Sequence, residues 1–154
     1  MAGQEALRLV DQVGAGDHYL GVLITQDPHG EPQVSVVNGG VLPHPLNGEP
    51  RVGVVAHGGT AKLRNLRRRP RATIVFRSGW QWVAVSGPVE LAGPDDPMPG
   101  LSADGLRQLL RDVYQAAGGN HPDLDEYDRA MAADRRCAVL IRPDRVTTNP
   151  TDLA

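Results

Sequence analysis

The sequence contains one cysteine, Cys137, and no apolar run long enough to cross a membrane. A single thiol cannot form an intrachain disulfide, and it excludes any Cys-x-x-Cys zinc or redox motif. A membrane helix needs about 20 mostly apolar residues, and the amino terminus carries Glu5, Arg8 and Asp11 where a secretory signal is uncharged. These absences favour a soluble, cytoplasmic protein that folds without disulfides or structural zinc.

Signatures of common nucleotide and metal sites are missing as well. The sequence has neither the Gly-x-x-x-x-Gly-Lys-Ser/Thr loop of nucleoside-triphosphate enzymes nor the Gly-x-Gly-x-x-Gly fingerprint of dinucleotide folds. The five histidines are scattered, and no two of them stand four residues apart as helical metal ligands do. We therefore expect no metal site.

The 154 residues are 40% hydrophobic and 22% charged, which is typical of a globular chain. We expect a single domain over residues 1–154, with a polar tail at about 150–154. The net charge is only −2, but no acidic residue occurs between Glu49 and Glu90, where eight basic residues stand. Such a block is typical of a solvated helix face, a nucleic-acid patch or a pocket for an anionic ligand.

Short apolar segments separated by turn residues predict six strands. They cover residues 19–25, 33–37, 52–56, 72–76, 80–91 and 137–141. Residues 38–50 are rich in glycine and proline and are expected to connect strands without regular pairing throughout. Apolar spacing of three and four residues predicts helices at 60–69, about 106–117 and about 123–136, and the residues after Pro143 are expected to form a polar tail. Tight turns favour antiparallel pairing, so we expect a mainly β fold, a small barrel or sandwich with attached helices.

The segment from His57 to Asn65 is the first candidate binding site. Lys62 is the only lysine of the sequence, and it lies in the first turn of an expected helix. A positive charge is unfavourable there unless an anion is bound, because that end of a helix carries partial positive charge. The two glycines before the expected N-cap, Thr60, let the backbone approach a ligand, and free N–H groups add donors. The pattern favours a phosphate or carboxylate site, and a solvated basic surface helix is the alternative.

Trp80 and Trp82 form the second candidate. Residues two apart in a strand share a face, so both indoles are expected on one side and Val83 and Val85 on the core side. The sequence has only one phenylalanine, two tryptophans and three tyrosines, so two of its six aromatic residues stand at this one place. The two rings could wall a flat ligand or pack beneath the carboxyl-terminal helices, and the sequence leaves both interpretations open.

Both candidates stand within one longer pattern. It runs from Val52 through His57-Gly-Gly-Thr-Ala-Lys-Leu-Arg-Asn65 to the strand ending at Phe76, and continues from Gly79 through Trp-Gln-Trp to Val-Ala-Val-Ser-Gly87. This pattern resembles the pyridoxamine 5′-phosphate oxidase-like split β-barrels, and most of all their branch that depends on the deazaflavin coenzyme F420. The stretch from Tyr114 to Arg136 is also similar to that branch.

The resemblance implies a six-stranded antiparallel split barrel of the FMN-binding type, with a short inter-strand helix and two helices in the second half of the chain. It also implies a homodimer that holds a flavin-type cofactor in a groove between its subunits. By motif position, Lys62 matches the phosphate-binding lysine, residues 57–60 match the turn along the cofactor, and Trp80 matches a tryptophan near the ring. The full expected cofactor-binding set is His57, Gly58, Gly59, Thr60, Lys62, Arg64, Asn65, Trp80 and Trp82.

The resemblance and the residues together predict an oxidoreductase that transfers hydride between reduced F420 and a small unsaturated or electron-poor substrate. The basic block favours F420 over FMN, because the glutamyl tail of F420 adds carboxylates to its phosphate. The alternatives are an FMN-dependent enzyme of the same fold and a non-catalytic flavin- or deazaflavin-binding protein. A further alternative is nucleic-acid binding through Arg64 to Arg71, with the tryptophans as stacking partners. No catalytic residue is assigned.

Overall fold

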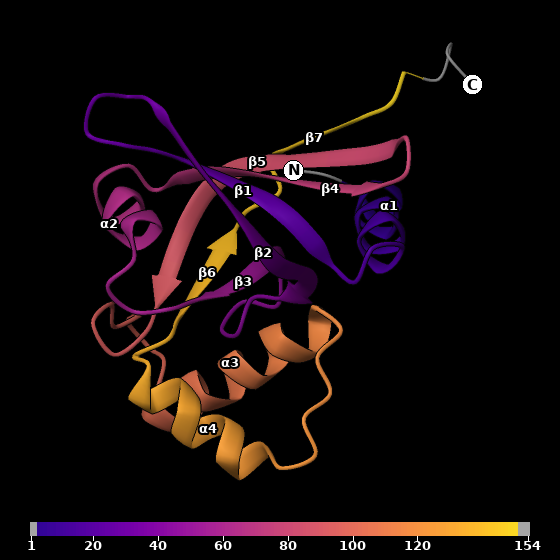
Figure 1. Cartoon of the computed structure of the whole chain (residues 1–154). Coiled ribbons are helices and arrows are strands. Elements are labelled where there is room, and N and C mark those ends of the chain that lie inside the picture. Colours follow the sequence, from indigo (N-terminus) through magenta and orange to yellow (C-terminus); the bar gives the residue numbers. More distant parts are fainter. Residues whose placement is uncertain (1–2, 151–154) are drawn as a thin grey trace.

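The computed structural model describes residues 3–150, which form seven strands and four helices (Figure 1). The strands are β1 (Leu20–Gln26), β2 (Pro32–Pro43), β3 (Pro50–Ala56), β4 (Arg71–Ser78), β5 (Gln81–Ala92), β6 (Cys137–Ile141) and β7 (Arg145–Thr148). The helices are α1 (Gln4–Ala15), α2 (Ala61–Arg68), α3 (Ala103–Ala116) and α4 (Leu124–Ala133). None of the helices in this described range has the length and apolar character needed to cross a bilayer.

Six of the strands close into an antiparallel barrel. In the order β1, β2, β3, β6, β5, β4, each strand pairs with the next, and β4 pairs back to β1. Closure in this way satisfies the backbone groups that an open sheet would leave at its edges. β7 is an additional strand that pairs with β5. The predicted mainly β fold with a six-stranded antiparallel split barrel is confirmed.

Two long strands change partners along their length. β2 pairs with β1 up to Asn38 and with β3 from Gly39 onward, and β5 passes in the same way from β4 to β6. Gly40 stands just after the change-over, and a Cβ atom there would lie 2.2 Å from the carbonyl oxygen of Ala116, at the end of α3. The missing side chain therefore lets α3 pack directly onto β2.

The barrel strands bury apolar side chains in two clusters. Val83 and Val85 of β5 are fully buried in the barrel interior, as their alternation with Trp82 and Ala84 predicts. Every residue of β6 is buried, because one face of the strand lies in the barrel and the other lies under the helices. There Ala138 and Leu140 join an apolar cluster that includes residues of α3 and α4.

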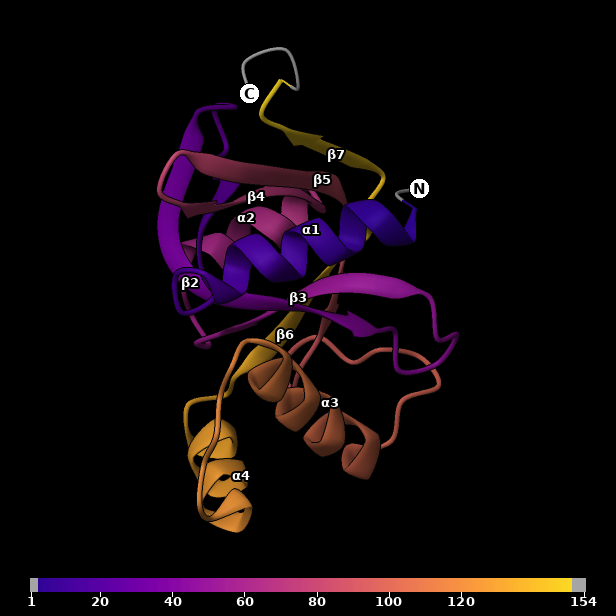
Figure 2. The same ribbon diagram turned by 90° about the vertical axis from the view of Figure 1, so that its right-hand side faces the viewer.

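The helices cover different sides of the barrel. In Figure 1, α2 and α1 lie on opposite sides, and α3 and α4 lie below. Figure 2, turned by 90°, shows α1 crossing in front of the barrel. The turn between β4 and β5 lies on the α1 side, where a Cβ atom on Gly16 would come within 2.5 Å of the Ser78 hydroxyl. This turn is therefore on the side of the barrel away from α2.

Several boundaries differ from the sequence-based expectations. The prediction misses α1, although Leu7, Val10 and Val13 have helical spacing and are buried. The predicted connection over 38–50 is wrong in its first part, because β2 continues to Pro43 and pairs with β3. The predicted tail after Pro143 is wrong over 145–148, which pairs with β5 as β7. Residues 151–154 of that tail lie outside the described residues.

The ends of the predicted helices are also corrected. α4 ends at Ala133 instead of Arg136, and Arg135 has a positive φ of 51°, which is incompatible with continuing the helix. Trp80 is not in a strand: it lies in the turn before β5, next to Gly79 with φ 62°. Both differences arise from left-handed backbone positions that the apolar periodicity does not report.

α2 is fixed to the barrel by a buried polar contact. Asn65 is only 4% exposed, and its Nδ2 donates to Thr25 Oγ1 on β1 at 3.1 Å. The Asn65 Oδ1 accepts from Arg68 Nη2 at 2.7 Å. Because buried polar groups destabilise a fold when they lose their partners, this contact sets the position of α2 on the barrel.

Replacing Asn65 with alanine should lower the free energy of unfolding by about 1–3 kcal/mol, because it leaves the buried Thr25 hydroxyl without a donor. Urea unfolding followed by circular dichroism measures the change. The control is Gln115→Ala, at an exposed helical position on α3, which should cost less. Equal stability of Asn65→Ala and the unmodified protein would show that this contact does not hold α2 in place.

Candidate functional site

The first turn of α2 has no side-chain cap. Thr60 occupies the N-cap position with φ −80° and ψ 157°, as predicted, but its side chain makes no capping hydrogen bond. Instead, Thr60 Oγ1 donates to the carbonyl oxygen of His57 at 3.0 Å. No acidic residue lies in the first turn to balance the helix dipole. This end of α2 therefore offers backbone N–H donors and partial positive charge without a side-chain acceptor from the helix itself.

The turn that precedes α2 is anchored to the end of α4. The Gly58 N–H donates to the carbonyl oxygen of Asp134 at 3.1 Å. A Cβ atom on Gly58 would lie 2.7 Å from the carbonyl oxygen of Arg135, so only glycine allows this close approach. Gly59 has a φ of 77°, which also favours glycine. The two glycines of the motif therefore have a structural cause: they bring the turn against the chain that follows α4.

His57 joins this anchor through its side chain. Its Nε2 lies 3.6 Å from Asp134 Oδ1, and its Nδ1 lies 2.9 Å from the carbonyl oxygen of Gly58. The His57 ring is about half exposed. The ring therefore faces solvent on one side while one carboxylate and one carbonyl oxygen fix its orientation.

Lys62 lies at the edge of a cavity of about 380 Å³. The cavity is bounded by residues of β2, β3, α3 and α4, and its polar lining includes His57, Asn38 and Arg136. Lys62 is half-buried, and within residues 3–150 it forms no hydrogen bond or ion pair. No aspartate or glutamate lines the cavity. Lys62 and Arg136 are the two cationic side chains of the lining, and Arg136 is paired with Asp134, which lies outside the lining, at 3.3 Å. The positive lining suits an anion.

Two tyrosines form another wall of this cavity. The ring centroids of Tyr114 and Tyr127 lie 4.6 Å apart, and their planes are tilted by 37°. The Tyr127 hydroxyl donates to the carbonyl oxygen of Leu110 at 3.0 Å, and burial raises the pKa of this tyrosine to about 12. Tyr127 therefore stays neutral at physiological pH and contributes an aromatic surface next to the two cations.

The structure brings only part of the expected set to this cavity. His57 and Lys62 line it, whereas Gly58, Gly59 and Thr60, which form the turn between them, do not. Arg64 and Asn65 do not line it. Arg64 Nη1 folds back to donate to the carbonyl oxygen of Gly59 at 2.7 Å, and the Asn65 amide is occupied by its buried contact on β1. In this chain, both side chains therefore support the turn and the helix.

The two tryptophans lie elsewhere. The Trp80 side chain is 95% exposed, Trp82 is partly buried on β5, and neither lines the Lys62 cavity. Asn149 fixes their backbone, since its Oδ1 accepts from the Trp82 N–H at 2.9 Å and its Nδ2 donates to the Trp80 carbonyl oxygen. A single chain therefore does not bring the tryptophans and Lys62 into one site.

Most arginines of the basic block have partners of their own. Arg67 makes two hydrogen bonds to the Asp96 carboxylate, at 2.8 and 2.7 Å, which raise the pKa of this arginine. Arg51 is buried and pairs with Glu90 at 3.3 Å, and Arg69 donates to Gln26. These pairs leave Lys62 as the member of the block that faces the cavity.

Sequence reasoning missed the residues that reach the cavity from distant segments. These are Asn38 from β2, Tyr114 from α3, Tyr127 from α4, and Arg136. The helical spacing of α3 and α4 predicted amphipathic helices, but not which of their residues line the cavity beside Lys62. Among the described residues no three histidine, cysteine or carboxylate side chains are grouped to hold a metal ion. Cys137 is buried in β6, and burial raises its pKa to about 12, so its thiol stays protonated.

Comparison with known proteins places this fold in a family. The family profile described as pyridoxamine 5′-phosphate oxidase matches residues 10–149. An FMN-binding, pyridoxamine 5′-phosphate oxidase-related protein of Nostoc punctiforme superposes with a TM-score of 0.62 and 16% identity, over 96% of this chain and 86% of that one. An F420 reductase superposes with a TM-score of 0.58 and 17% identity, over 96% of this chain and 98% of its own.

A third similar structure is a heme-binding protein of Mycobacterium smegmatis, with a TM-score of 0.62 and 19% identity. The match covers 97% of this chain but only 55% of that protein, which is therefore much longer. At these identities the three structures establish the shared fold, while the family profile covers nearly the whole chain. The resemblance seen in the sequence is thus confirmed, and the chain belongs to the pyridoxamine 5′-phosphate oxidase family.

Proposed function

We propose that this protein is an oxidoreductase that binds coenzyme F420 with the phosphate at Lys62 and the first turn of α2. It transfers hydride between the reduced cofactor and a small unsaturated or electron-poor substrate. The observation that carries the proposal is the cation-lined cavity, which has no lining carboxylate and opens beside an uncapped helix end.

The residues of the cavity fit a phosphate-bearing ligand. Lys62 supplies an ammonium group that has no partner within residues 3–150. The backbone N–H groups at the start of α2 adjoin Lys62 in the chain and have no side-chain cap. A volume of about 380 Å³ is at the small end of ligand sites, which span about 300–1,000 Å³. It suits the phosphate of the cofactor and the anionic groups next to it, while the rest of an extended cofactor would lie outside the cavity.

In this proposal the cofactor supplies the hydride chemistry when it is bound. The protein holds and orients the cofactor. Lys62 and the α2 backbone bind the phosphate, and the turn at residues 57–60 lies along the part of the cofactor next to the phosphate. Asp134 orients the His57 ring through its contact with Nε2. The wall formed by the half-buried Tyr114 and the buried Tyr127 covers one side of the ligand.

The family relationship supports a flavin-type cofactor in general, since one similar structure binds FMN and another is an F420 reductase. F420 is the preferred ligand because its phosphate and its glutamyl carboxylates suit a cavity with two cations. An FMN enzyme of the same fold, and a protein that binds either cofactor without turnover, are distinguished by the experiments below.

A second copy of the chain would complete the site. Trp80 is 95% exposed in the turn between β4 and β5, on the side of the barrel away from α2 (Figure 1). An exposed tryptophan is unusual on a free surface and common in interfaces. We propose a homodimer in which Trp80 and Trp82 of one chain wall the ring of a cofactor held by Lys62 of the other.

The direct test is to titrate purified protein with F420 and with FMN under the same conditions and to follow cofactor fluorescence. We expect tighter binding of F420 and, with reduced F420, oxidation in the presence of an electron-poor acceptor. Tight binding of FMN alone would contradict the choice of cofactor. Binding of F420 without turnover of any acceptor would identify a carrier instead of an enzyme.

Lys62→Ala should weaken F420 binding by about 10- to 100-fold, as expected for the loss of one hydrogen bond to a charged group. The fold should be unaffected, because the Lys62 side chain makes no hydrogen bond or ion pair within residues 3–150. Arg71→Ala is the matched control: it removes one positive charge from the same block at an exposed position outside the cavity. Unchanged affinity of Lys62→Ala would remove this residue from the site.

The shared site can be tested by mixing two defective variants. Trp80→Ala and Lys62→Ala should each bind F420 poorly, and unfolding and refolding them together should restore binding at about a quarter of the sites, in mixed dimers. Light scattering should give twice the 16.5 kDa mass of one chain. Leu46→Ala, at another exposed apolar position, is the control and should bind normally. A monomer, or no recovery on mixing, would contradict the shared site.

A further inference from the structure

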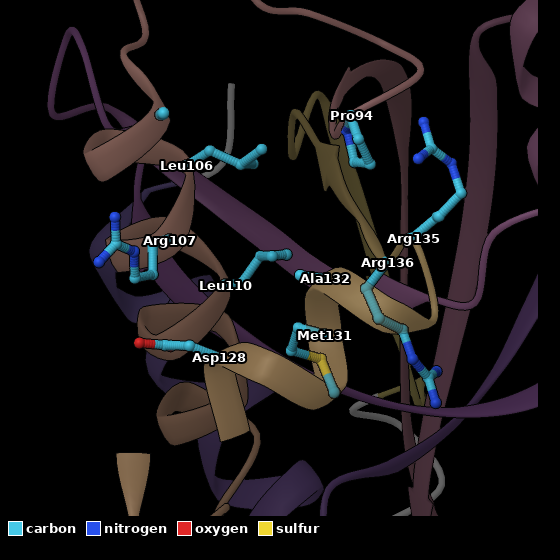
Figure 3. Close-up of a pocket in the computed structure, with 10 residues that line it drawn as sticks. Pro94, Leu106, Arg107, Leu110, Asp128, Met131, Ala132, Arg135 and Arg136 are labelled. Carbon is cyan, nitrogen blue, oxygen red and sulfur yellow. The ribbon is translucent and has the colours of Figure 1, made fainter. Parts of the chain in front are cut away.

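Arg136 is the second cation of the Lys62 cavity. It lies just beyond α4 and lines the same cavity as Lys62 and His57. Its neighbour Arg135 does not line that cavity. Figure 3, a view of the neighbouring cleft between α3 and α4, shows the two side chains pointing in opposite directions, with Arg135 toward Pro94 and Arg136 away from it. Both side chains border this cleft, and of the two only Arg136 also lines the Lys62 cavity.

The Arg136 guanidinium has donors to spare. Its Nη2 donates to Asp134 Oδ2 at 3.3 Å. Its Nε is buried and has no hydrogen-bond partner within the described residues. A guanidinium carries five N–H donors, and a buried donor without an acceptor is unfavourable. The donors on Nη1 have no acceptor within the described residues either, and they remain for an acceptor oxygen of a ligand in the cavity.

Arg136 shares its carboxylate partner with His57. Asp134 is the carboxylate paired with it, and Asp134 also contacts His57 Nε2 at 3.6 Å. One carboxylate thus faces two groups that can be cationic, and it is not itself part of the cavity lining. The Arg135 guanidinium, by contrast, is held by the Asp95 carboxylate.

We propose that Arg136 is a second anion-binding residue of this cavity, so that the cavity selects ligands with two separate anionic groups, one at Lys62 and one at Arg136. The inference deepens the proposed function and rests on it for the identity of the ligand. FMN has one phosphate and no carboxylate, whereas F420 has a phosphate and the carboxylates of its tail. Arg136 is then the residue that separates the two cofactors.

The test measures the affinities for F420, FMN and inorganic phosphate in the unmodified protein and in three variants. Arg136→Gln should weaken F420 binding about tenfold or more and leave FMN and phosphate binding unchanged. Arg136→Lys, which keeps the charge but loses the planar donors, should weaken F420 binding less. Arg135→Gln is the matched control and should bind all three as the unmodified protein does. Thermal unfolding of each variant verifies the fold.

Two results would overturn the inference. One is unchanged F420 affinity in Arg136→Gln. The other is an equal loss for F420, FMN and phosphate, which would mean that Arg136 and Lys62 hold the same group.

Failure of the proposed function gives a different result, namely that the unmodified protein does not bind F420. Inorganic pyrophosphate, which has two phosphoryl groups and no ring, is then titrated into the same variants. Weaker pyrophosphate binding in Arg136→Gln, with phosphate binding unchanged, would support the second anion site. Equal pyrophosphate affinity in Arg136→Gln and the unmodified protein would overturn it.

Discussion

The positive end of α2 lacks a carboxylate or a capping side chain, and the account of this protein depends on that imbalance. Thr60 occupies the capping position, but its hydroxyl donates a hydrogen bond to the His57 carbonyl oxygen, and Lys62 adds a full charge in the same turn. A protein that only needed a stable helix would gain from an acidic residue there. The arrangement is favourable when an anion completes it, and the cavity beside Lys62 provides the space.

The barrel brings distant segments to this helix end. The glycine turn before α2 approaches the chain after α4 so closely that a side chain on Gly58 would collide with Arg135. At Gly40, α3 meets β2 without an intervening side chain. These two close approaches place the tyrosines of α3 and α4, and Arg136, around the same cavity as Lys62. The fold therefore assembles the cavity from four segments, of which the sequence motif supplies one.

The sequence predicts well what local rules determine. The six barrel strands follow from alternation and turn residues, the start of α2 follows from its N-cap Thr60, and its end follows from Pro70. Lys62 could be chosen from its helix position alone. Residues such as Tyr127 and Arg136 could not, because they reach the cavity beside Lys62 only through the packing of α4, which no periodicity encodes.

Asn65 illustrates a second limit of sequence reasoning. Its motif position suggests a ligand contact, whereas in the folded chain its amide binds Thr25 in the interior. Helical spacing alone does not tell which polar residue faces inward. The tryptophans are a third case, because the positive φ of Gly79 places Trp80 in a turn and away from Lys62. The two parts of the motif can meet only between chains, which is why the oligomer matters for the proposal.

The most direct test of the central claim is a nuclear magnetic resonance titration of the unmodified protein with inorganic phosphate, followed through the backbone amides. If the uncapped end of α2 binds anions, the amide shifts should concentrate at residues 58–63 and saturate together. Shifts distributed over the arginines at 67–71, or no saturation at the α2 end, would contradict the account.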